Sequence, residues 1–403
     1  MKIAAFNAIR PGTDKVHLVA TRSYVSYTLT QLRKKLNENP FSFLHIIHPD
    51  LGARKIHTSK STTERYQKVR KKFDEFMEEG ILSRDAKPSL YIYRQIKKGH
   101  AFTGLIAAVS VDDYLTGKVK KHEQTLSKRQ ERFTTYLEHT RINAEPVLLT
   151  YSGEDVPGRI FEKYMSQRAE YDFTQTTRVR HQLWVVNDEE DVNSLVKAFG
   201  KIPAFYIADG HHRCASSALL WEKKKKEGPG PRDYFLSLIL HESNVKIYDF
   251  NRLVRDLGKY TPESFLHAID AHFIVEPQQE IYRPVCKGEF SMYLEHQWYR
   301  LRLRPGHDFT QLDAQVLTDL VLRPLLGISD LRKDKRISFV EGPQGMEGLK
   351  KLVDRGKYKV AFGLFPVSTS ELKFMADNEL TMPPKSTWIE PKLRSGMVIY
   401  ELS

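Results

Sequence analysis

Apolar and polar residues along this chain follow two different periods, and stretches of each alternate over most of its length. Apolar runs bounded by turn residues predict strands at residues 43–49, 90–96, 102–111, 146–150, 181–186, 204–208, 234–240 and 298–303. Apolar positions spaced three and four apart predict helices that start at residues 61 and 121 and helices over 191–199, 214–226 and 311–326. The order predicts a mixed α/β (α+β) fold, with an α/β unit between about residues 100 and 245.

The helix expected from residue 121 would begin with Lys121-His122-Glu123-Gln124. Its apolar residues Leu126, Phe133 and Leu137 would face the core. Its basic residues would face mostly outward, and these are Lys128, Arg129 and Arg132. Two other helix starts have the spacing of a capping box, at residues 61–64 and 368–371.

The chain has 403 residues, of which 40% are hydrophobic and 11% aromatic. This length exceeds one ordinary core, so we expect two or three packed units, at residues 1–99, 100–245 and 246–403. No apolar run is long enough to span a bilayer, and the first residues lack the apolar segment of a secretion signal. Only two cysteines occur, which excludes a disulfide framework and fits a reducing compartment. We therefore expect a cytoplasmic protein that has no membrane partner.

The formal net charge of +13 could attract nucleotides, nucleic acid or other anions, but it is spread along the chain. The densest block, residues 223–226, runs into a Gly-Pro-rich loop and is typical of a solvated helix end. We find no helix-turn-helix pattern after the central motif and no basic stripe interleaved with aromatic residues. The sequence therefore disfavours nucleic acid as a partner.

The motif Asp209-Gly210-His211-His212-Arg213 lies between an expected strand and an expected helix. The first backbone N–H groups of a helix have no partner inside it, and the aligned peptide dipoles leave partial positive charge there. Gly210 lets the backbone approach a ligand closely, while His211, His212 and Arg213 add donors and charge. The motif therefore predicts a nucleotide-phosphate site, in which Asp209 could hold a hydrated magnesium ion.

Two other interpretations of this motif remain open from the residues alone. The same residues could form an ordinary turn with satisfied histidines and a helix cap. A zinc site is disfavoured, because the cysteine or clustered acidic partners expected at ligand spacing are missing nearby.

Three separated segments resemble a known pattern: residues 121–123 (Lys-His-Glu), 208–213 (Ala-Asp-Gly-His-His-Arg) and 382–387 (Met-Pro-Pro-Lys-Ser-Thr). Through them the whole chain resembles the family known as domain of unknown function 1015. The same segments are similar to those of the ADP-dependent free serine kinases, which share one nucleotide-binding fold with partition protein ParB and sulfiredoxin. The resemblance implies a ParB/sulfiredoxin-like nucleotide-binding unit over residues 100–245, embedded in a larger chain. It also implies phosphoryl transfer between an adenine nucleotide, ADP or ATP, and a serine hydroxyl with Mg²⁺.

Carried over residue by residue, the resemblance implies that Glu123 is a catalytic glutamate. It implies a phosphate and magnesium motif at Asp209 to Arg213, in which Asp209 and His212 also take part in catalysis and Gly210 and His211 bind the nucleotide. The positions that it leaves for the substrate are His122, Phe250, Arg252, Lys385, Ser386 and Thr387.

General chemistry supports a base at Glu123, because a serine hydroxyl is a poor nucleophile until a nearby group accepts its proton. Taken alone, Glu123 could instead be an exposed first-turn glutamate that complements the helix dipole. Residues 385–387 could likewise be an ordinary proline-rich surface turn.

Departures from the family pattern leave the acceptor open. Thr21-Arg22-Ser23-Tyr24 stands where the family has Pro-Pro-Tyr-Asp, and Phe250-Asn251-Arg252 stands where it has Thr-His-Arg. Sulfiredoxin has a reactive cysteine where this chain has His211, and we interpret Cys214 as a small helix residue, so sulfiredoxin chemistry is excluded.

The leading hypothesis is a phosphotransferase that acts on serine, O-phosphoserine or a similar hydroxy amino acid, in either direction. The alternative is a non-catalytic, ParB-like nucleotide-binding switch or regulatory protein, which needs a phosphate site but no base. The enzyme hypothesis predicts that the three motif segments converge around one polyphosphate.

Overall fold

The computed structural model describes residues 1–23, 26–51, 61–154, 158–308 and 310–403. The chain forms two compact units, unit 1 (Met1–Val245 with Pro391–Ser403) and unit 2 (Lys246–Glu390). Residues 1–99 and 100–245, which the sequence pattern assigns to different regions, contribute strands to one sheet. The hairpin of β5 (Leu90–Lys97) and β6 (His100–Ser110) joins them across Gly99.

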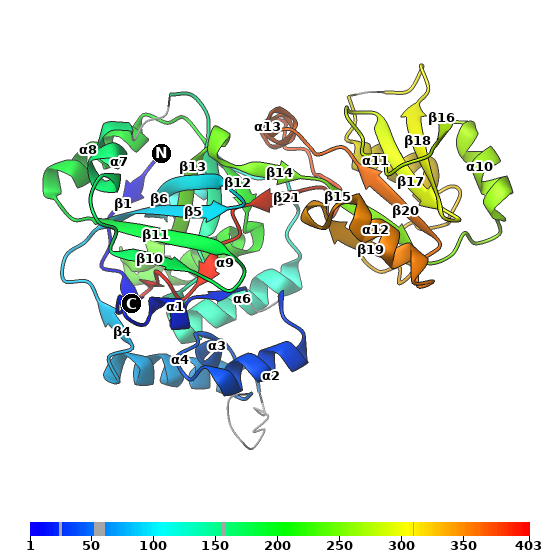
Figure 1. Cartoon of the computed structure of the whole chain (residues 1–403). Coiled ribbons are helices and arrows are strands. Elements are labelled where there is room, and N and C mark those ends of the chain that lie inside the picture. The colour runs from blue at the N-terminus through cyan, green and yellow to red at the C-terminus, as the bar shows by residue number, and fades with distance from the viewer. Residues whose placement is uncertain (24–25, 52–60, 155–157, 309) are drawn as a thin grey trace. The chain divides into compact units, whose positions relative to one another are not determined.

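The main sheet of unit 1 has the strand order β10-β11-β5-β6-β13-β9-β12-β7, and β1 pairs with β6 (Figure 1). Most neighbours are antiparallel, but β13 pairs with β9 and β12 with β7 in parallel. The remaining bounds are β1 (Ile3–Ala4), β7 (Val119–Lys120), β9 (Val147–Tyr151), β10 (Tyr171–Thr174), β11 (Val179–Val186), β12 (Phe205–Asp209) and β13 (Tyr234–His241).

Smaller two-stranded pairs complete the strands of unit 1. They are β2 (Ile9–Pro11) with β4 (Leu82–Arg84), β3 (Thr21–Arg22) with β22 (Arg394–Ser395), and β8 (Ile142–Asn143) with β23 (Tyr400–Glu401). Through β22 and β23 the end of the chain returns to unit 1.

The helices of unit 1 bury their apolar faces against the sheet and against one another. Their bounds are α1 (Val16–Val19), α2 (Leu29–Glu38), α3 (Leu44–Ile47), α4 (Thr62–Glu78), α5 (Val111–Leu115), α6 (Ser127–Thr140), α7 (Gly158–Met165), α8 (Glu189–Gly200) and α9 (His211–Lys224). As predicted, α4 starts after Ser61, whose side chain accepts a hydrogen bond from the Glu64 N–H. Helix α6 lies between α4 and α9. In the residues that the structure describes, no helix is both long and apolar enough to cross a membrane.

Unit 2 is built on an antiparallel sheet with the order β16-β18-β17-β20-β15-β19, and a separate pair joins β14 to β21 (Figure 1). Its strands are β14 (Lys246–Tyr248), β15 (Phe250–Val254), β16 (Phe273–Gln278), β17 (Glu289–Leu294), β18 (Gln297–Leu303), β19 (Ile337–Glu341), β20 (Val360–Leu364) and β21 (Trp388–Glu390). Its helices are α10 (Pro262–Asp270), α11 (Asp313–Leu317), α12 (Gly345–Asp354) and α13 (Thr369–Asp377). The capping box predicted at Ser368 is present at the start of α13. The mixed α/β class predicted from the sequence is confirmed in both units.

Three predicted elements are wrong. The strand predicted over residues 43–49 is absent, and Leu44–Ile47 form helix α3 there, because a short apolar run does not distinguish a buried strand from a buried helical turn. The helix predicted from Lys121 begins at Ser127, and Leu126 is exposed instead of buried. The helix predicted over residues 311–326 is an α-helical turn, α11, followed by a π-helical stretch at Thr318–Leu322.

Candidate functional site

The parallel pairing of β7 with β12 brings two of the three motif segments together. Phe205 lies opposite Val119, and Tyr206 lies opposite Lys120. Since parallel strands run in the same direction, their carboxyl ends meet at one edge of the sheet. The chain leaves β7 through Lys121, His122 and Glu123, and it leaves β12 through Gly210 into α9. This register explains why residues that lie 89 positions apart in the sequence come into contact. We call His122, Glu123 and residues 209–213 the loop-edge site.

The Lys121–Gln124 segment lies in the loop before α6 instead of in a first helical turn. The alternative in which Glu123 complements the dipole of that helix is therefore wrong. The loop lets His122 turn inward while the Glu123 side chain stays 44% exposed.

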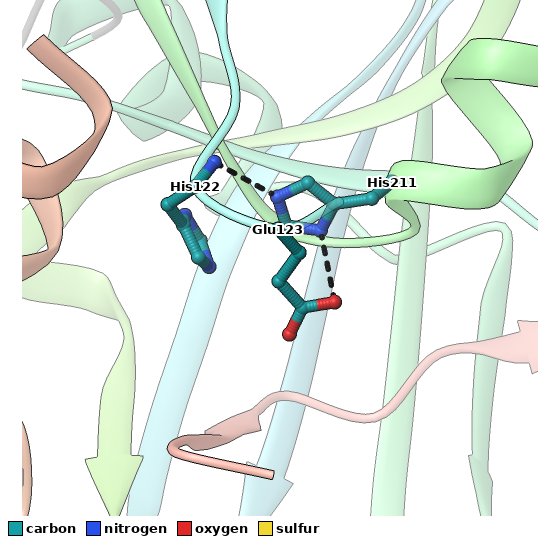
Figure 2. Close-up of side chains that lie close together, drawn as sticks. All are labelled: His122, Glu123 and His211. Carbon is teal, nitrogen blue, oxygen red and sulfur yellow. Dashed lines mark hydrogen bonds and ion pairs between the residues drawn. The ribbon is translucent and has the colours of Figure 1, made fainter. Parts of the chain in front are cut away.

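His211 is the centre of the contact between the two segments (Figure 2). Its Nδ1 atom lies 3.7 Å from Oε2 of Glu123, and its Nε2 atom accepts a hydrogen bond of 3.4 Å from the backbone N–H of His122. A neutral imidazole that accepts at Nε2 carries its proton on Nδ1, so the N–H bond faces the carboxylate. Burial lowers the pKa of His211 to about 3, which keeps the ring neutral.

His122 is the second buried histidine of the site. Its ring meets that of His211 edge to face, with the ring centroids 4.5 Å apart. Burial is also the largest cause that lowers the pKa of His122 to about 3, and His211 adds to it. Neither ring nitrogen of His122 has a hydrogen-bond partner among the described residues. A buried polar group without a partner is costly, so these nitrogens are candidate ligand-binding atoms.

Gly210 gives the motif its sharp turn. Its φ of 107° lies in the left-handed region, and a Cβ atom placed there would lie 2.8 Å from Nε of Arg213. Helix α9 starts at the next residue, and the N–H groups of Arg213 and Cys214 both donate to the Gly210 carbonyl oxygen. The N–H groups of His211 and His212 come earlier in the first turn, and the first turn of a helix is where anions commonly bind.

Asp209 and Arg213 belong to one charged network. Nη2 of Arg213 donates to Asp209 at 3.1 Å, Nη1 donates to the Pro146 carbonyl oxygen at 2.6 Å, and Glu145 lies 3.5 Å away. Lys392 lies 3.8 Å from the other oxygen of Asp209. Burial alone would raise the pKa of Asp209, but Lys392 and Arg213 lower it below its usual value. Arg213 and Lys392 already neutralise this carboxylate. Asp209 alone is therefore poorly suited to hold a magnesium ion.

A cavity of about 520 Å³ opens beside this network. Arg213 lines it at the start of α9, and Tyr66, Phe133 and Tyr136 supply aromatic walls from α4 and α6. Its cations include Arg65, Lys128, Arg129 and Arg132. The last three are exposed, as the sequence pattern predicted, and they border the cavity from α6.

The remaining predicted site residues gather inside unit 2, and we call Phe250, Arg252 and residues 385–387 the arginine cluster. The Arg252 side chain donates to the carbonyl oxygens of Phe250 and of Lys385, the latter at 3.0 Å. Lys385, in a left-handed turn with φ of 60°, places Nζ 5.3 Å from the centre of the Phe250 ring. Ser386 is buried and donates its hydroxyl hydrogen to the Pro383 carbonyl oxygen at 2.7 Å.

Arg252 is fully buried, and its Nε and Nη2 atoms have no hydrogen-bond partner within the ranges that the structure describes. Burial lowers the pKa of its guanidinium to about 9. The group still carries charge at neutral pH, so it is a strong candidate to hold an anion.

Two further predicted positions can be placed. Thr21 and Arg22 form β3, whereas Tyr24 of the same departure lies outside the described residues. Cys214 is fully buried in α9, and burial raises the pKa of its thiol, which disfavours a nucleophilic thiolate.

Comparisons with known proteins can be set beside this geometry. Residues 3–320 match the model of a family described as "Protein of unknown function (DUF1015)". No curated protein matches the chain.

Several solved structures are similar to the chain at low identity. Free serine kinase in complex with AMP is 15% identical over 74% of this chain and 91% of that chain, with a TM-score of 0.37. A mutant of free serine kinase in complex with ADP is 17% identical over 74% and 92%, with a TM-score of 0.38. SbnI with a C-terminal truncation, from Staphylococcus aureus, is 15% identical over 72% and 85%, with a TM-score of 0.39.

Proposed function

The chain belongs to the DUF1015 family, and we propose that it transfers a phosphoryl group between an adenine nucleotide and serine, O-phosphoserine or a similar small hydroxy amino acid. One observation carries the proposal: the carboxylate of Glu123 lies beside the first turn of α9, to which His211 links it. The motif resemblance to the serine kinases supports the same chemistry. Phosphoryl transfer needs an anion cradle and a proton acceptor in one place, and the loop-edge site offers both.

The nucleotide is assigned to the cavity and to the start of α9. Tyr66, Phe133 and Tyr136 offer aromatic faces for the base, and the cations of α6 offer charge for phosphates. Arg213 lines the cavity and also belongs to the Asp209–Arg213 motif, so it connects the cavity with the start of α9. The backbone N–H groups of His211 and His212, in the first turn of α9, would bind the phosphate oxygens.

Glu123 is assigned the role of general base. Its exposed carboxylate can accept the proton of a substrate hydroxyl, and the neutral ring of His211 directs an N–H group toward it. In the reverse direction the same carboxyl group returns the proton to the hydroxyl oxygen. His211 is therefore a positioning residue for Glu123 in addition to a part of the phosphate site.

Magnesium would enter with the nucleotide phosphates, where it would supply positive charge to the transferring oxygens. Asp209 instead fixes Arg213 and Lys392, which contribute positive charge of their own. His212 is assigned to phosphate binding through its backbone N–H.

The arginine cluster of unit 2 is assigned to an anionic group of a ligand, either a carboxylate or a phosphate. Arg252 offers two donors that have no partner among the described residues, and exposed Lys385 adds a cation. Thr387 is half-buried and keeps its hydroxyl for a ligand, whereas the Ser386 hydroxyl already serves the turn.

The test compares Glu123→Gln with Glu131→Gln, which removes a carboxylate from the exposed face of α6. Phosphorus NMR follows transfer among nucleoside di- and triphosphates, L-serine and O-phosphoserine in the presence of Mg²⁺. We expect Glu123→Gln to lower the turnover number by about 10²- to 10⁴-fold, because it keeps the shape but cannot accept a proton. Nucleotide affinity should stay within about twofold, since the cradle is intact. Wild-type turnover in Glu123→Gln, or no transfer by the wild-type protein, would contradict the proposal.

A nucleotide-binding switch is the second candidate function. One observation favours it: the cavity is lined by Arg213 but not by Glu123 among the described residues. A switch needs the cradle and not the base, so it predicts saturable ADP or ATP binding with no transfer in the wild-type protein.

A further inference from the structure

The loop-edge site brings together three side chains of the kinds that bind transition metals. His122, Glu123 and His211 each offer one ligand atom, and these atoms lie within 4.8 Å of one another (Figure 2). Two imidazoles with one carboxylate form a common ligand set for zinc. The sequence could not reveal this set, because His211 lies 89 positions from His122.

A second observation points to a ligand at this place. His122 is 1% exposed, and both of its ring nitrogens lack a hydrogen-bond partner among the residues that the structure describes. A metal ion would satisfy one of these nitrogens. The exposed carboxylate of Glu123 leaves a path from solvent to the ion.

We propose that His122, Glu123 and His211 form a binding site for one zinc-class divalent cation. In a tetrahedral zinc site, neighbouring ligand atoms lie about 3.4 Å apart, so atoms that are up to 4.8 Å apart must approach one another by about 1.4 Å. Glu123 can supply part of this movement, because it is exposed and lies on a loop. A water molecule would complete the coordination.

The cation and a proton compete for one nitrogen of His211. Nδ1 faces Glu123 and carries the proton in the metal-free site. When the ion binds Nδ1, the ring proton resides on Nε2, and the 3.4 Å contact with the backbone N–H of His122 is lost. The two N–H groups then face each other without an acceptor, so this change opposes binding, and the metal–ligand bonds must outweigh it.

Occupancy of the site would also remove Glu123 from its role as base. This consequence rests on the proposed function, whereas the site itself does not. Zinc should therefore inhibit phosphoryl transfer, and a chelator should restore it.

The experiment uses the full chain, stripped with a chelator and free of nucleotide. Zinc binding is measured by calorimetry and by competition with a chromogenic chelator, and Co²⁺ is added to record its absorption spectrum. We expect one ion per chain with a dissociation constant of about 1 μM or tighter, an absorption band typical of tetrahedral Co²⁺, and no competition from millimolar Mg²⁺.

Glu123→Ala should weaken zinc binding at least tenfold, and the exposed position of Glu123 makes misfolding a poor explanation. His122→Asn should weaken it further, provided that circular dichroism shows a folded chain. Glu131→Ala and His296→Gln, which alter an exposed carboxylate and an exposed histidine, should leave it unchanged. Absence of saturable zinc binding, or equal binding by Glu123→Ala and the wild-type protein, would overturn the proposal. Because no nucleotide is present, a failure here is distinct from a failure of phosphoryl transfer.

Discussion

The loop-edge site of unit 1 and the arginine cluster of unit 2 differ in how they keep charge in the fold. The loop-edge site pairs its charges: Asp209 meets Arg213 and Lys392, and Glu123 meets the N–H group of His211. The arginine cluster keeps a fully buried guanidinium, two of whose nitrogens have no hydrogen-bond partner among the described residues. Under the proposed function, the paired charges of unit 1 would suit proton transfer beside an anion, and the buried guanidinium of unit 2 would suit anion binding.

Substitution of Gly210 tests the anion cradle of unit 1 and should have the largest effect. Gly210→Ala forces a side chain into the left-handed region and into contact with Arg213, so the free energy of unfolding should fall by about 2 kcal/mol or more. Nucleotide affinity should fall by at least about tenfold, because the first N–H groups of α9 are displaced.

Gly200→Ala is the matched control, since a Cβ atom at Gly200 meets nothing within 4 Å. Denaturant unfolding and fluorescence titration with ADP measure the two effects. If the two alanine variants had equal free energies of unfolding and equal ADP affinities, the start of α9 would not be the anion-binding part of the loop-edge site.

The two units should respond to pH with opposite sign. In unit 1, burial and the nearby Arg394 lower the pKa of His181 from 6.5 to about 3, so its neutral form stabilises the fold above pH 6.5. This stability is lost as the pH falls from 6.5 towards 3, and the loss is about 2 kcal/mol at pH 5.

In unit 2, burial raises the pKa of Asp313 from 3.8 to about 7, so the protonated form stabilises the fold below pH 3.8. This stability is lost as the pH rises through 7, and unit 2 should be about 2 kcal/mol more stable at pH 5 than at pH 7 from this group. Hydrogen exchange of peptides from each unit measures both trends. His181→Gln should flatten the first trend and Asp313→Asn the second, and the same sign in both units would contradict the assignment.

Removal of the buried Arg252 charge in unit 2 tests whether this side chain binds an anion or only fills space in the fold. Arg252→Met keeps most of the volume, so the affinity for O-phosphoserine should fall by about tenfold or more while the fold is retained. The exposed Arg255→Met serves as control. Isothermal titration with O-phosphoserine measures this affinity. An unchanged affinity in Arg252→Met would mean that Arg252 only stabilises the turn at Lys385 and does not bind the anion.

Lys385 should contribute the smallest effect because it is exposed and screened by salt. Lys385→Gln should weaken O-phosphoserine binding by about two- to fivefold, with less effect at high ionic strength. Lys351→Gln, which changes another exposed lysine of unit 2, should leave binding unchanged. Isothermal titration measures both, and equal affinity in Lys385→Gln and the wild-type protein would exclude a role of Lys385 in anion binding.

The motif at residues 209–213 could be placed from the sequence because its signals are local. An apolar run, a glycine and a helical period follow each other directly, and the structure has β12, Gly210 and α9 in that order. Helix α4 was predictable for the same reason, since Ser61 caps it and Val69, Phe73 and Phe76 share one face.

Contacts set by strand pairing could not be predicted in this way. Helical spacing suggested that Glu123 begins a helix, but the pairing of β7 with β12 holds it in a loop beside His211. The same pairing brings His122, Glu123 and His211 together. Because His211 is far from the other two in the sequence, local ligand spacing could not predict this set. Residues 43–49 show the limit for short segments, because an apolar run of this length suits a strand or a helical turn equally well.

The most direct test of the central claim is a crystal structure of Glu123→Gln with ADP and O-phosphoserine, in which transfer is blocked and both ligands can be seen. We predict a phosphate group within about 3 Å of the backbone N–H groups of His211 and His212, and a phosphoester oxygen within hydrogen-bond reach of residue 123. A nucleotide whose phosphates lie away from the start of α9, or a serine oxygen remote from residue 123, would contradict the claim.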